Sequence, residues 1–399
     1  MIEFLIFKLE VKKMDNKFVY LDNNATTQVA PEVWQIMSES QQLFGNASSM
    51  HGFGRAAAMG ISKARGQVAS LIGANKDEIY FTSGATESNN IVFNIGASLI
   101  DKNKGKGRIV TTTIEHPAII ETAKYLRTKG YTIDLVNVDS TGLLDLEDLK
   151  NKLDKDVVLV SVMSANNETG TIQPIREAAA LAHEVGALFH SDATQSIGKM
   201  EISMEDIGID YLSLSGHKFY GPKGIGVLAT RNKAPIFNLM HGGHQEKGYR
   251  PGTYNNFAII GLGKACDIAK RDLSFEKEKL WTMREALRKG ILERIDEVVV
   301  NGNQEHCLPG TLNVSFPGAE GESILLYLDM EGIAVSTGSA CATGSLEPSY
   351  VLLAGGLDIE IAHGSIRFSL GRYNSMEDVD YVLEKLPPII KRIREMSTR

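Results

Sequence analysis

Residues 213–228 read SLSGHKFYGPKGIGVL, and this stretch sets the frame of the fold. It opens in an apolar run at 211–215 and leaves it through a tight Ser-Gly-His-Lys turn, which Gly216 allows. A second turn, Gly-Pro-Lys-Gly, follows before another apolar run at 226–229. The pattern therefore predicts a strand, a polar turn that carries Lys218, and a further strand.

Similar short apolar runs recur upstream, and longer stretches with helical periodicity separate them. Continuous apolar strands that alternate with helices predict a mainly parallel sheet, buried on both faces and covered by helices. We expect strands at 79–81, 108–112, 157–163, 187–192, 211–215 and 226–229, and helices near 86–100, 117–129 and 174–185.

The pattern changes near residue 270. A charged stretch, RDLSFEKEKLWTMREALRKG, begins at Arg271 and predicts a long solvent-facing helix. A shorter strand-helix-strand pattern follows at 298–300, 322–330 and 365–370, before a terminal helix from Ser375. A chain of 399 residues is also too long for one typical core. We expect an N-terminal extension over 1–17, a large domain over 18–270 and a smaller α+β domain over 271–399.

The charge balance excludes one class of partner. Forty-two basic and forty-nine acidic residues give a formal charge of −7, whereas nucleic-acid-binding domains are usually basic. The N-terminal apolar run is interrupted by Glu3, Lys8 and Glu10, which predicts neither a signal peptide nor a membrane span. Met14 precedes the first motif, and we expect residues 1–13 to be dispensable.

The chain has three cysteines, Cys266, Cys307 and Cys341. This sparse, odd set favours a reducing compartment, and hence the cytoplasm, over a disulfide scaffold. Cys266 lies in a helical pattern and is expected to be buried, while Cys307 has no evident role. Cys341 lies in the Gly-, Ser- and Ala-rich stretch 336–345, which predicts a lightly packed loop where a thiolate can react.

Lys218 is the sharpest local feature, because a lysine amine can bond an aldehyde and activate carbonyl chemistry. Ser215 and His217 offer donors beside it that suit a phosphate. Taken alone, Lys218 could equally be a surface loop lysine. Asp192 ends the run ALFHSD, where a carboxylate needs a partner such as a protonated ring nitrogen. The alternative is an aspartate that caps a helix.

Polar residues follow other strands as well. In FTSGATESNN, residues 81–90, a helix start at Ala85 and Thr86 favours a bound phosphate, although a plain capping box is the alternative. His116 could stack on a flat ring or be structural, and Asn167 could bond a ring hydroxyl or only shape a turn. Polar side chains at five strand ends of one sheet together predict a ligand site.

These blocks together resemble the class V, fold-type-I pyridoxal-phosphate enzymes and, within them, the cysteine desulfurases of the nitrogen-fixation and iron–sulfur-cluster type. The resemblance runs from YLDNNATT at 20–27 to FSLGR at 368–372, and it includes SGHKFYGPKG, DATQ and GSAC. It implies a mainly parallel seven-stranded sheet between helices, with a smaller α+β domain. It also implies pyridoxal phosphate as the coenzyme and a homodimer with shared sites.

The resemblance assigns roles to individual residues. Lys218 would bond the coenzyme and carry the proton at the substrate α-carbon, His116 would stack on the ring and act in catalysis, and Cys341 would accept sulfur. Asn46, Asn167 and Arg367 would bind the substrate, and an arginine fork suits its carboxylate. The full coenzyme-binding set would be Ala85, Thr86, His116, Asn167, Asp192, Gln195, Ser215, His217, Lys218 and, from the neighbouring subunit, Thr253.

The implied reaction converts L-cysteine to L-alanine and leaves a persulfide on Cys341 for a sulfur acceptor or an iron–sulfur scaffold protein. Selenocysteine lyase, cysteine sulfinate desulfinase and a non-catalytic assembly scaffold are the alternatives. Ala47 replaces the usual proline of the family, and the chain ends at MSTR, so docking of a cluster scaffold through a longer tail is in doubt. His241 and His244 alone predict a loop, not a metal site.

Overall fold

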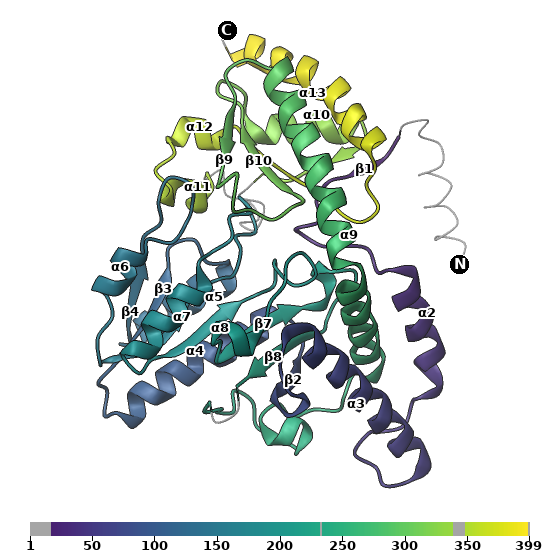
Figure 1. Cartoon of the computed structure of the whole chain (residues 1–399), viewed down its shortest axis with the longest axis vertical. Coiled ribbons are helices and arrows are strands. Elements are labelled where there is room, and N and C mark those ends of the chain that lie inside the picture. Colours follow the sequence, from purple (N-terminus) through teal and green to yellow (C-terminus); the bar gives the residue numbers. More distant parts are fainter. Residues whose placement is uncertain (1–16, 232–233, 338–347, 398–399) are drawn as a thin grey trace.

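A computed structural model describes residues 17–231, 234–337 and 348–397 (Figure 1). Its centre is a seven-stranded sheet in the order β2-β8-β7-β6-β5-β3-β4. Only β8 runs antiparallel to its neighbours, which confirms the mainly parallel sheet. The strands are β2 (Ile79–Thr82), β3 (Arg108–Thr112), β4 (Thr132–Val136), β5 (Val157–Ser161), β6 (Leu188–Asp192), β7 (Tyr211–Ser215) and β8 (Gly226–Thr230).

The sheet is buried on both faces because successive residues of each strand pack into different cores. On one face, Leu159 packs in a core with residues of α4 (Ala85–Lys102) and α5 (Pro117–Thr128). On the other, Val160 packs in a larger core with residues of α7 (Ile175–Glu184). The continuous apolar runs of the sequence are explained by this two-sided burial.

A second layer has its own core and a three-stranded antiparallel sheet in the order β12-β10-β9. The first strand among the described residues belongs to this layer, because β1 pairs in parallel with β11 and Leu21 lies in the second core. The elements are β1 (Val19–Tyr20), β9 (Val299–Asn301), β10 (Thr311–Ser315), α10 (Gly321–Met330), β11 (Ile333–Ala334), β12 (Ser365–Ser369) and α13 (Met376–Ser397).

Helix α9 (Asn256–Arg294) joins the two layers and runs through both in Figure 1. The helix expected from Arg271 is the later part of α9, and it is not solvent-facing throughout: Leu280 and Leu287 are buried in the second core. The expected domain change near 270 falls inside this helix, so the boundary stays a prediction.

The remaining helices flank these layers and connect their strands. They are α2 (Pro31–Glu39), α3 (Gly52–Ile72), α6 (Leu146–Asn151), α8 (Met204–Ile207), α11 (Tyr350–Ala354) and α12 (Ile359–His363). Within the described ranges, no helix combines the length and the apolar character that crossing a membrane requires.

Candidate active site

A cavity of about 540 Å³ opens at the carboxyl ends of the central strands, within the size range of small-molecule sites. Nine of the sequence-predicted residues line it, from the ends of β2, β3, β5, β6 and β7, which is where open α/β sheets place ligands. These residues are Ala85, Thr86, His116, Asn167, Asp192, Gln195, Ser215, His217 and Lys218.

The start of α4 forms one wall of the cavity. Gly226, at the start of β8, packs so closely on Gly84 that a Cβ at 226 would lie 2.6 Å from the Gly84 Cα. This contact holds the first turn of α4, with Ala85 and Thr86, against the cavity. The first amides of a helix have no intrahelical acceptor and favour an anion, so this wall suits a phosphate group.

Lys218 ends a single 3₁₀ turn, Gly216–Lys218, that follows β7 directly. Its ammonium donates to the carbonyl oxygens of Asn24 and Ala25, at 2.7 and 2.8 Å. The N-terminal loop therefore reaches across the molecule to hold this amine at the cavity, an arrangement that the sequence did not predict.

Asp192 is buried at the end of β6 with two hydrogen-bond donors on its carboxylate. Asn89 Nδ2 donates at 2.7 Å and the backbone N–H of Thr194 at 2.9 Å. The second contact closes a local turn; residues 194–199 form turns and not a helix, so the capping alternative is wrong, and the carboxylate also lines the cavity. Asn89 lies in the quoted motif FTSGATESNN, but its role at Asp192 was missed.

Both cavity histidines are held in their neutral form. The Nδ1 atom of His116 accepts from the Ala118 N–H at 3.1 Å, and burial lowers the pKa of the ring. Burial, Lys218 and Lys223 lower the pKa of His217 to about 4, and its Nδ1 lies 3.1 Å from the Thr26 hydroxyl. A neutral ring can face a flat cofactor or donate one N–H to an anion without a charge penalty.

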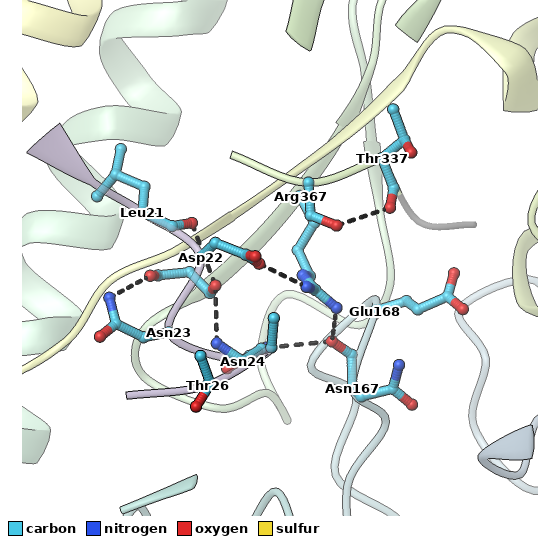
Figure 2. Close-up of polar contacts among 12 residues, drawn as sticks. Leu21, Asp22, Asn23, Asn24, Thr26, Asn167, Glu168, Thr337 and Arg367 are labelled. Carbon is cyan, nitrogen blue, oxygen red and sulfur yellow. Dashed lines mark hydrogen bonds and ion pairs between the residues drawn. The ribbon is translucent and has the colours of Figure 1, made fainter. Parts of the chain in front are cut away.

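Arg367 does not line the cavity, but it contacts Asn167, which does (Figure 2). Its Nη2 forms a 2.7 Å ion pair with the Asp22 carboxylate, and its Nη1 donates to the Asn167 carbonyl at 3.0 Å. Arg367 is 4% exposed. Two contacts from two parts of the chain thus fix the plane of the guanidinium.

Besides Arg367, three predicted site residues are not among those that line the cavity. Asn46 is exposed, and its side chain accepts from the Ser48 N–H. Thr253 is also exposed. Cys341 lies outside the described residues. Of the other thiols, Cys266 is fully buried as expected, which raises its pKa, and Cys307 is buried as well.

Sequence reasoning missed several polar residues near the cavity. Lys199, four residues after Gln195, donates to the Gln195 and Asn24 side chains, both at 2.8 Å. Glu115 is fully buried beside His116, and burial raises its pKa to about 8. Asn24 lies in the motif YLDNNATT, but no role was predicted for it. The contacts of these residues join distant parts of the chain, so no local sequence pattern predicts them.

The cavity has the polar atoms that a substituted pyridine phosphate requires. Asn167 Oδ1 and Thr194 Oγ1 are buried and have no hydrogen-bond partner within the described part of the chain. Buried polar atoms of this kind are rarely left unpaired. Together with the carboxylate of Asp192, the amine of Lys218 and the start of α4, they fit pyridoxal phosphate.

Residues 19–382 match the aminotransferase class-V family, and the chain belongs to this family, whose coenzyme is pyridoxal phosphate. More particularly, it is 49% identical over 385 residues to the cysteine desulfurase IscS of Clostridium botulinum, covering 96% of both chains. It is 45% identical over 381 residues to the cysteine desulfurase NifS of Azotobacter vinelandii, covering 95% and 94%. A solved NifS-like protein superposes with a TM-score of 0.87 at 41% identity, covering 96% of this chain and all of that one.

Proposed function

We propose that this protein, which is a cysteine desulfurase, transfers the sulfur that it removes from L-cysteine to its own Cys341. The observation that carries the proposal is the convergence of Lys218, Asp192 and His116 on one cavity that also has unpaired buried polar atoms. Relatives of nearly equal length that are cysteine desulfurases support it.

The coenzyme-binding residues divide by the part of the coenzyme that each one suits. Ala85, Thr86, Ser215 and His217 would hold the phosphate. Asp192 would keep the ring nitrogen protonated, His116 would stack on the ring, and Asn167 and Gln195 would bond its hydroxyl. When bound, the coenzyme accepts the electrons released at the substrate α-carbon. Lys218 would bond the coenzyme and then move the proton at that carbon.

Arg367, with Asn167 and Asn46, would bind the carboxylate of cysteine. Asp22 and the Asn167 carbonyl already orient the guanidinium plane, so a substrate meets a preformed fork. A carboxylate of the right geometry can use two of its N–H groups together, which suits an amino acid substrate.

Cys341 would attack the substrate sulfur as a thiolate. A sulfur–sulfur bond forms and the carbon–sulfur bond breaks; the electron pair stays on carbon, which takes a proton and leaves as L-alanine. Described residues before and after this segment bond to Arg367 and Glu168, both of which are next to Asn167 of the cavity, and this supports the role. Ser336 exchanges two backbone hydrogen bonds with Arg367, and Ser349 donates to the Glu168 carboxylate.

The protein is proposed to act as a homodimer with shared sites. Thr253 and Asn46, which do not line the cavity, lie near one surface, because Asn256 donates to the carbonyl oxygens of Leu43 and Gly45. The loop that carries Asn46 and the start of α3 have exposed apolar side chains, Phe44, Met50 and Phe53. Exposed apolar groups of this size are typical of an interface. A cytoplasmic sulfur acceptor or iron–sulfur scaffold protein would then receive the persulfide.

A thiol trap tests the proposal. The protein, loaded with pyridoxal phosphate, is incubated with L-cysteine, alkylated, digested and weighed peptide by peptide. We expect one extra sulfur on the Cys341 peptide and none on those of Cys266 and Cys307. In C341A protein, alanine release should stop. An unmodified Cys341 peptide, or alanine release by C341A at the normal rate, would contradict the function. Selenocysteine and cysteine sulfinate serve as parallel substrates.

A further inference from the structure

Lys199 is a partly buried lysine for which the proposed function has no use. It follows β6 and Gln195, and its ammonium donates to the side-chain oxygens of Asn24 and Gln195, both at 2.8 Å. Both acceptors are buried, with exposed fractions of 2% and 5%, so the ammonium points inward toward the cavity wall.

Both acceptors are neutral amide oxygens, so this cation is held without a carboxylate in those contacts. Burial, together with Lys218 and Arg367, lowers the pKa of Lys199 to about 7. A methionine would fill a similar volume at a lower electrostatic cost. A titratable group kept in an unfavourable environment beside a ligand cavity is a candidate for a functional role.

The ammonium fixes which way the Gln195 amide points. A lysine ammonium has three donors and no acceptor, so only the Oε1 atom of Gln195 can face it. The Nε2 atom is then directed away from Lys199 and donates to the Asn24 carbonyl at 2.9 Å. Nε2 has a second N–H besides the one given to Asn24, and because Gln195 lines the cavity this N–H is the group available to a ligand there.

The same ammonium also fixes Asn24. Its Oδ1 faces Lys199, which leaves Nδ2 to donate to the Asn167 carbonyl and the Thr311 hydroxyl, at 3.2 and 2.9 Å. The backbone carbonyl of Asn24 accepts from Lys218. Lys199 thus contacts one proposed coenzyme-binding residue directly, Gln195. It is connected to two others, Asn167 and Lys218, through the buried Asn24.

We propose that Lys199 is a positioning residue that holds the Gln195 amide with its N–H toward the ring hydroxyl of the coenzyme. This inference rests on the proposed function, because it assumes a bound pyridoxal phosphate. In this proposal Lys199 makes Gln195 a hydrogen-bond donor, and not an acceptor, at that point of the cavity. The site should therefore prefer a coenzyme whose ring oxygen is ionised.

Two coenzyme forms test the inference: pyridoxal phosphate and its analogue that lacks the ring hydroxyl. Apoprotein is titrated with each, and the ratio of the two dissociation constants is compared between wild type and Lys199→Met. We expect wild type to favour pyridoxal phosphate by about tenfold or more, and K199M to reduce this ratio severalfold, because Asn167 would still bond the hydroxyl while the Gln195 hydrogen bond to a charged oxygen is weakened. Lys277→Met, on an exposed lysine of α9, should keep the wild-type ratio.

The ratio separates positioning from a general structural role. If K199M weakens binding of both forms equally, or leaves the ratio unchanged, the inference is wrong. Should K199M fail to fold, Lys199→Ala takes its place with the same criterion. If wild type binds neither form, the proposed function fails and this inference with it. If wild type discriminates between the two coenzyme forms, and K199M and K277M do so equally well, only this inference fails.

Discussion

Lys218 is the residue whose removal should matter most. Its amine is held at the cavity by two carbonyl oxygens and is the group expected both to bond the coenzyme and to move a proton. For Lys218→Ala we expect sulfide release from cysteine to fall at least about a hundredfold. The coenzyme absorbance should also be lost on dialysis. Lys277→Ala should behave as wild type, and a K218A protein that retains colour and turnover would contradict the role.

Glu115 should make stability depend on pH. It is fully buried, and burial first, then Asp192, raises its pKa from 4.5 to about 8. A raised pKa means that the folded state favours the protonated carboxyl. The stabilising contribution is therefore complete below about 4.5 and is lost as the pH rises toward 8. A tenfold difference in proton affinity between the folded and unfolded states corresponds to about 1.4 kcal/mol of stability.

Glu115→Gln removes this titration while keeping an oxygen for the Thr112 hydroxyl and the Met163 N–H. We expect the free energy of unfolding of E115Q, relative to wild type, to increase as the pH rises from 5 to 8. Urea unfolding at several pH values measures it. A difference that is constant with pH would show that Glu115 does not titrate in this range.

The contact between α3 and α9 depends on a glycine. A Cβ at Gly263 would lie 2.7 Å from the Cα and Cβ of Ala64, which are parts of a helix and cannot move aside easily. Gly263→Ala should therefore cost about 1–3 kcal/mol by overpacking. Gly66→Ala is the matched control, because a Cβ there meets only the flexible end of Lys76 and gains up to about 1 kcal/mol of helix propensity. Equal effects in denaturant unfolding would exclude this packing argument.

The elements that the sequence predicted are those whose pattern is local. Strands with continuous apolar residues were placed to within two residues at either end, because both faces of the sheet are buried. β4 was missed because Thr132 is exposed and Asp134 interrupts the run. β10 was missed because Asn313 is polar yet buried, where it accepts from Asn301. In α9, the charged residues hid the buried positions between them.

The site divides in the same way. The nine lining residues were predicted because each ends or follows a strand of one sheet. The carboxyl ends of parallel strands meet at one edge of the sheet, where ligands bind. Lys199 and Asn24 were missed because their contact joins positions 175 residues apart in the sequence. A polar side chain acquires that kind of partner only through the tertiary fold.

At the scale of the whole molecule, the loop from Asp22 to Asn24 joins the two layers at the site. Asp22 pairs with Arg367 of β12, and Asn24 contacts Thr311 of β10 as well as Lys199 beside β6. Figure 2 shows this loop beside Arg367 and Asn167. The coenzyme cavity and the proposed carboxylate contact are therefore set relative to each other by one short segment that is bonded to both layers.

If the subunits share their active sites, two different inactive subunits should restore activity when they form a mixed dimer. K218A and T253A homodimers should each be defective, the second because it would lose a proposed contact to phosphate worth about 1.5–3 kcal/mol. They are co-expressed with different tags, and the mixed dimer is isolated and assayed at limiting coenzyme. If Thr253 acts across the interface, one site of the mixed dimer has both lesions and the other has none. Activity should then recover to about half of wild type. If Thr253 serves its own subunit, every site has one lesion, and the mixed dimer stays as inactive as its parents.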